Sequence, residues 1–98
     1  MKQFPDILEG YQLGLLFGLT PVQAKRAIRI YEFIRLDDHW TNKRNNYALM
    51  VDCLYLLAKE HKTGITTLKV VDITKKQRGY GTQPMPHRWY NQYKELFE

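Results

Sequence analysis

The chain has 98 residues, 44% of them hydrophobic and 13% aromatic, which is enough for one modest core and a single domain over residues 1–98. A net charge of +5 and a pI near 9.4 favour acidic partners such as nucleic acid. The single Cys53 excludes an intramolecular disulfide and a thiolate metal cluster, and fits a reducing, cytoplasmic location. Because residues 1–9 lack a secretory pattern and no run nears the roughly 20 apolar residues of a membrane span, we expect no membrane partner.

The first predicted helix covers residues 5–17. Pro5 and Asp6 suit a first helical turn, and the apolar residues after them follow helical spacing. Two glycines in this region have different expected roles. Gly14 falls where two helices would approach closely, and Gly18 falls in a turn that needs a positive φ.

The second predicted helix covers residues 20–36 and has a well-defined start. Thr20 is a good N-cap, Pro21 fits the first turn, and Gln23 completes a Thr-x-x-Gln capping box. The inner side of this helix is apolar, with Leu19, Ala24, Ala27, Ile28, Tyr31 and Ile34. The outer side presents Thr20, Gln23, Lys25, Arg26 and Arg29.

Residues 10–29 read GYQLGLLFGLTPVQAKRAIR and resemble the helix-turn-helix of DNA-binding proteins. In the register that starts at Gly10, the inward positions are apolar: Leu13, Phe17, Leu19, Ala24 and Ala27. The resemblance covers these twenty residues only, and it implies that the second helix lies in the major groove of duplex DNA. Gln23 would then pair with an adenine edge and Arg26 with guanine. A hairpin that is only structural is the open alternative.

The third predicted helix, residues 47–58, is apolar on all sides and is therefore expected at the centre of the fold, with Gly64 ending it. Its single charged residue is Asp52. A carboxylate in such a helix more often reaches solvent or caps a neighbouring backbone than takes part in catalysis. We therefore expect a structural role for Asp52.

Residues 65–78 fit two secondary structures. Their β-branched residues favour a strand, whereas the apolar spacing favours a helix that starts at Thr66 or Thr67, and we prefer the helix. A helix followed by RGYG would resemble the recognition helix and wing of winged-helix proteins, so a short β-hairpin or wing around residues 65–85 stays open. Residues 75–88 are predicted to form a mobile basic loop. Its expected phosphate contacts are Lys75, Lys76 and Arg78.

Residues 87–98 are predicted to form an amphipathic C-terminal helix. One face of this helix carries Trp89, Tyr93, Leu96 and Phe97. Such a face must be covered, either by the core of the same chain or by a second copy in a homodimer. With this segment, the predicted fold is mainly α, a compact bundle of four to five helices that contains the helix-turn-helix.

The leading functional hypothesis is a small DNA-binding protein, a transcriptional regulator that reads duplex DNA with the start of helix 20–36. The alternative is a non-enzymatic adaptor or inhibitor that binds a protein partner through the aromatic residues Trp40, Tyr80, Trp89 and Tyr90. No metal site, cofactor site or catalytic motif is expected. The histidines are far apart in the sequence, at His39, His61 and His87.

Overall fold

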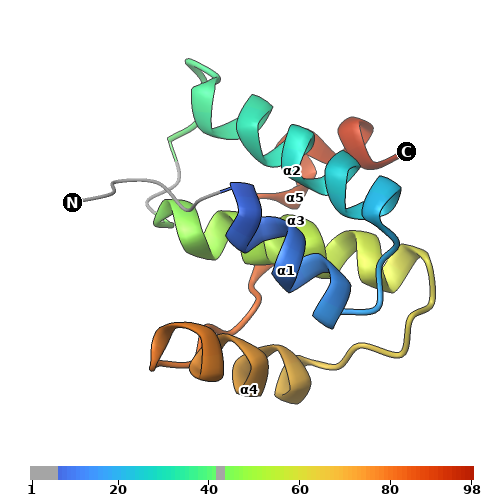
Figure 1. Cartoon of the computed structure of the whole chain (residues 1–98). Helices are drawn as coiled ribbons and strands as arrows, with labels where there is room; N and C mark the ends of the chain where they lie inside the picture. Colours follow the sequence, from blue (N-terminus) through green and yellow to red (C-terminus); the bar gives the residue numbers. More distant parts are fainter. Residues whose placement is uncertain (1–6, 42–43) are drawn as a thin grey trace.

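The computed structural model describes residues 7–41 and 44–98, and all the regular secondary structure in these ranges is helical (Figure 1). The elements are α1 (Ile7–Leu16), α2 (Pro21–Leu36), α3 (Asn46–Glu60), α4 (Thr67–Arg78), η1 (Pro86–Arg88), α5 (Tyr90–Tyr93) and η2 (Lys94–Phe97). The Cα radius of gyration is 12.2 Å, close to the ~13 Å expected of a compact chain of this length. The prediction of a mainly α, compact bundle is confirmed.

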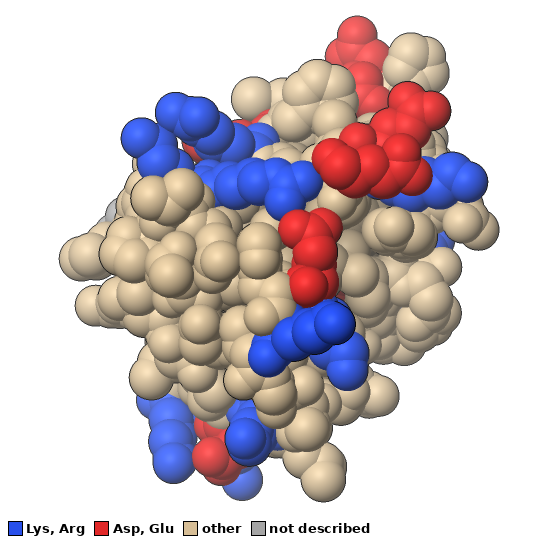
Figure 2. Space-filling model, turned by 90° about the vertical axis from the view of Figure 1, so that its right-hand side faces the viewer, with Lys and Arg blue, Asp and Glu red and all other residues tan. Residues whose placement is uncertain are grey.

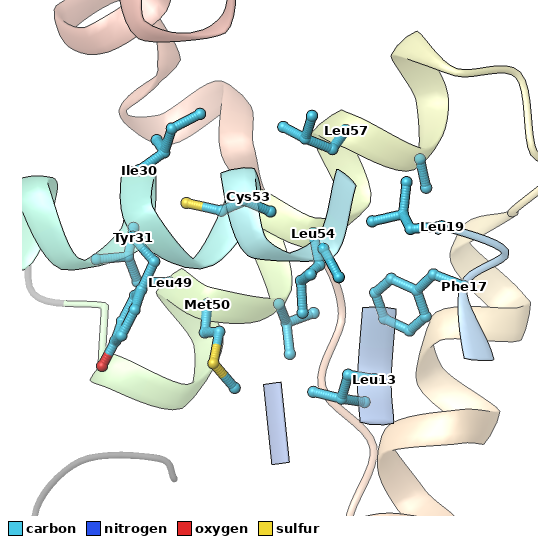
Figure 3. Packing of buried hydrophobic residues seen from close by; sticks show 14 of the residues in the cluster. Leu13, Phe17, Leu19, Ile30, Tyr31, Leu49, Met50, Cys53, Leu54 and Leu57 are labelled. Carbon is cyan, nitrogen blue, oxygen red and sulfur yellow. The ribbon is translucent and has the colours of Figure 1, made fainter. Parts of the chain in front are cut away.

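Helix α3 lies at the centre, in contact with α1, α2 and η1 (Figure 1). Helices α2 and α4 lie on opposite sides of α1 and α3 in this view. Figure 3 shows the side chains of α3 meeting those of α1 and α2. The labelled residues there are Leu49, Met50, Cys53, Leu54 and Leu57 of α3, with Leu13, Phe17, Leu19, Ile30 and Tyr31 around them. The apolar character of α3 on every side thus follows from its central position.

The hairpin of α1 and α2 has the local geometry expected from its glycines and its cap. Gly18 adopts φ +94°, and a Cβ on Gly14 would lie 2.6 Å from Cβ of Ala24, so a side chain at Gly14 would force the helices apart. Thr20 Oγ1 accepts a hydrogen bond from Gln23 N (3.2 Å), while Thr20 N donates to Gln23 Oε1 (2.9 Å). The predicted capping box and turn are therefore present.

The segment that fits two secondary structures, residues 65–78, forms helix α4 from Thr67 to Arg78, so the hairpin or wing considered for residues 65–85 is wrong. Thr66 caps α4 by accepting from Lys69 N (3.2 Å), and Gly79 ends it with φ +86°. The loop predicted from Lys75 starts only after Arg78, because the cations at 75–78 form the last turn of the helix, where positive charge is favourable. Its final residues, 86–88, form η1.

The C-terminal segment is three short helical turns and not the single helix predicted for 87–98. The backbone leaves the helical region at Trp89 (φ −139°) and again at Tyr93 (φ −125°). These breaks let Trp89, Tyr93 and Phe97 all reach the core, where they are 3–6% exposed. Three of the four residues on the apolar face that was also considered for a dimer contact are thus buried within the chain.

Candidate interaction surfaces

The predicted DNA-contacting residues of α2 divide into free and engaged side chains. Lys25 and Arg29 are exposed, and Thr20 is exposed but its hydroxyl belongs to the capping box. Gln23 is partly buried and its amide oxygen belongs to the capping box. Arg26 donates to Glu60 Oε2 at 3.0 Å, and its Nη2 lies 3.5 Å from the Leu96 carbonyl. The two side chains expected to read bases therefore already have partners within the protein.

The cations of α4 show a similar division. Lys75 is exposed, and Lys76 pairs loosely with Asp72 at 3.3 Å. Arg78 donates two hydrogen bonds of 2.7 Å to the carboxylate of Glu9, and its guanidinium carbon lies 4.1 Å from the ring centroid of Tyr47. Hydrogen bonding to Glu9 raises the pKa of Arg78 further above its ordinary value. Arg78 is thus a cross-link between α4 and α1.

The basic residues of the described chain do not gather on one side. The cations of α2 and those of α4 belong to helices on opposite sides of α1 and α3 (Figure 1). Figure 2 shows basic side chains in separate groups at the top, middle and bottom of one face, with acidic side chains next to them. A single duplex would therefore meet one of the two predicted groups at a time.

The four aromatic residues predicted to form an interface are mostly turned inward. Trp89 is buried, while Trp40 and Tyr90 are partly buried. The Trp40 and Trp89 rings meet edge to face with their centroids 6.1 Å apart. Only Tyr80 of the four is largely exposed, at 54%. Trp40, Trp89 and Tyr90 pack with rings of the C-terminal segment and so help to attach it to the core.

Asp52 is the structural anchor of the C-terminal half. Its carboxylate is fully buried and accepts hydrogen bonds from Arg44 Nε (2.6 Å), Arg44 Nη2 (2.9 Å), the Met85 backbone N (2.9 Å) and Trp89 Nε1 (2.8 Å). Arg44 also donates to the Gln83 carbonyl at 2.9 Å. The expected backbone cap is present, the arginine partner lies eight residues before Asp52, and the indole partner lies 37 residues after it.

A groove between α1 and α4 was not predicted from the sequence. Its volume is about 470 Å³, and its lining is Gln12, Leu15, Leu16, Ile73, Lys76 and Gln77. Leu15 and Leu16 remain 52% and 60% exposed. The available signal was in α1, which is apolar on more than one side and carries Glu9 as its one charged residue. We call this feature the α1/α4 groove.

The chain matches no known protein family, no curated protein and no solved structure. No helix in the described ranges has the length and apolar character to cross a membrane.

Proposed function

We propose that this domain is a protein-binding module that holds a helix of a partner protein in the α1/α4 groove. The observation that carries the proposal is the exposure of two adjacent leucines, Leu15 and Leu16, beside Ile73 in a groove with one charged lining residue. Because each of these leucines is already about half buried, covering one of them fully contributes roughly 1–1.5 kcal/mol to a complex. Contiguous exposed apolar surface on a folded domain is typical of an interaction site.

A helix is the shape that fits this groove best. Two neighbouring helices leave a channel between their side-chain ridges, and a third helix can place its own ridge there. Amphipathic helices bind apolar grooves in this way through anchors spaced three or four residues apart. The exposed groove residues come from both walls, with Leu15 and Leu16 on α1 and Lys76 on α4. A partner helix would therefore contact both.

Duplex DNA binding through the start of α2 is the second candidate. The exposure of Lys25 and Arg29 on one helix supports it, because these side chains could reach phosphates or bases. The engagement of Gln23 and Arg26 within the protein weakens it. In this alternative the α2 residues act without the α4 cations.

Two parallel selections separate these functions. One exposes the protein to a library of amphipathic helical peptides, and the other to random DNA duplexes. We expect peptides to be enriched and to bind Leu16→Glu at least about tenfold more weakly, a loss of roughly 1.4 kcal/mol. Val22→Glu is the matched control, because Val22 is 79% exposed on α2 outside the groove.

Two outcomes would contradict the proposal. If no peptide is enriched, or if Val22→Glu weakens binding as much as Leu16→Glu, the groove is not a binding site. Enrichment of a duplex whose binding falls with Lys25→Ala and Arg29→Ala, but not with Leu16→Glu, would establish DNA binding instead. Thermal melts of each variant verify that the fold is retained.

A further inference from the structure

We infer that the occupant of the α1/α4 groove is an amphipathic helix whose apolar face is flanked by acidic residues. The inference rests on the proposed function and adds the chemistry of the partner. It is carried by the distribution of charge around the groove. An apolar floor with the ammonium group of Lys76 on one wall is complementary to leucines flanked on one side by Glu or Asp.

The two walls of the groove differ in charge. On α1, the one charged residue is Glu9, and its carboxylate is neutralised by the two hydrogen bonds from Arg78. Helix α4 supplies Lys69, Lys75 and Lys76 against the single acid Asp72. The positive charge that is not neutralised within the pair of helices therefore belongs to α4, and acidic residues of a partner should face that wall.

Lys76 is the basic residue placed to contact the occupant. It is the charged member of the groove lining, and its side chain is 78% exposed. Its ion pair with Asp72 spans 3.3 Å between two exposed side chains one helical turn apart, an arrangement that contributes little in water. The ammonium group can therefore exchange Asp72 for a partner carboxylate at small cost.

The walls of the groove are held together before any partner binds. Near the start of α1, Glu9 is joined to Arg78, and Gln77 Nε2 lies 3.5 Å from the Glu9 carbonyl. Tyr47 Oη of α3 donates to Gln77 Oε1 at 2.6 Å. These contacts fasten the C-terminal end of α4 to α1 and α3. A groove with fixed walls loses little conformational entropy on binding, which favours a preformed docking site.

Two other occupants fit the charges less well. In a symmetric dimer through this groove, α4 of one copy would face either α4 or α1 of the other, and neither helix offers Lys76 an unpaired acid, because Glu9 of α1 is bonded to Arg78. An anionic membrane would attract the lysines of α4, but membrane-binding amphipathic helices carry Lys or Arg beside their apolar face, and the one charged residue of α1 is Glu9. An acidic amphipathic helix matches both the shape of the groove and the charge of its α4 wall.

The experiment uses the whole chain and a peptide library with leucines at i, i+3, i+4 and i+7. The flanking positions vary among Glu, Gln and Lys. We expect the parent protein to enrich Glu at one flank and to bind the Glu peptide roughly three- to tenfold more tightly than its Gln counterpart. The preference should diminish as salt rises, since salt screens exposed charges.

Charge reversal at Lys76 provides the specific test. Lys76→Glu should invert the flank preference from Glu to Lys, whereas Lys25→Glu, an exposed lysine on α2, should leave it unchanged. Peptides that bind through Leu16 with no flank preference would overturn this inference and leave the proposed function intact. Absence of any enriched peptide would overturn both.

Two further measurements test the other occupants, a second copy of the chain and an anionic membrane. Sedimentation equilibrium of the free protein detects a dimer, and co-sedimentation with vesicles of anionic lipid detects membrane binding. We expect a monomer and no vesicle binding. A dimer lost in Leu16→Glu, or vesicle binding lost in the same variant, would assign the groove to that occupant and refute the acidic helix.

Discussion

Replacing Asp52 with Asn should destabilise the fold far more than the same replacement at an exposed aspartate. The four hydrogen bonds to the Asp52 carboxylate use both of its oxygens, two bonds each. Asparagine offers one oxygen and one amide group, so at least two donors would face another donor. The Arg44 side chain is only 10% exposed and would lose its counter-charge.

The expected magnitude follows from the burial of this pair. Removing one partner of a buried ion pair costs about 3–5 kcal/mol, because the remaining charge stays desolvated. Domains of this size unfold with a free energy of about 5–15 kcal/mol, so the change removes a large part of the total. At roughly 4–8 °C per kcal/mol, the melting temperature should fall by at least ~12 °C.

The assay is denaturant unfolding followed by far-ultraviolet circular dichroism. Asp72→Asn serves as the matched control, because Asp72 is 63% exposed and its pair with Lys76 contributes less than about 0.5 kcal/mol. Replacing Arg44 and Asp52 together with leucine should recover part of the loss, since no unpaired charge remains. Equal unfolding midpoints for Asp52→Asn and Asp72→Asn would refute the reasoning.

Three further predictions concern the core and its edges. Gly14→Ala should lower the free energy of unfolding by roughly 1–3 kcal/mol, because the new Cβ would lie 2.6 Å from Cβ of Ala24. Adding Ala24→Gly should recover part of this loss in thermal melts, and no recovery would contradict the contact. The hydrogen bond from Tyr93 lowers the pKa of Asp37, so the stabilisation it provides should be lost as pH falls through that lowered pKa. In Tyr93→Phe, the melting temperature should therefore fall less steeply as pH is lowered. An unchanged pH dependence would show that the Tyr93 hydrogen bond does not couple Asp37 ionisation to stability. Burial raises the pKa of the Cys53 thiol, so a thiol reagent should modify it readily in denaturant and only through unfolding in the native protein; rapid native modification would contradict full burial.

The sequence by itself determined the first three helices and the local geometry of the first hairpin. The Thr20 capping box, the turn at Gly18 and the burial of α3 were all predicted correctly. Each depends on residues within a few positions of one another or on the periodicity of one helix. The same local signals could not decide between helix and strand for residues 65–78, where β-branched residues and apolar spacing disagree.

The tertiary structure alone decided which side chains are available to a partner. Arg26 pairs with Glu60, 34 residues away in the sequence, and Arg78 pairs with Glu9, 69 residues away. Two cations assigned to DNA contacts are therefore already paired with acids of the same chain. The α1/α4 groove also arises from tertiary packing. Periodicity shows that a helix has an apolar face, but packing decides whether another helix covers that face, as it does for α3 and does not for Leu15 and Leu16.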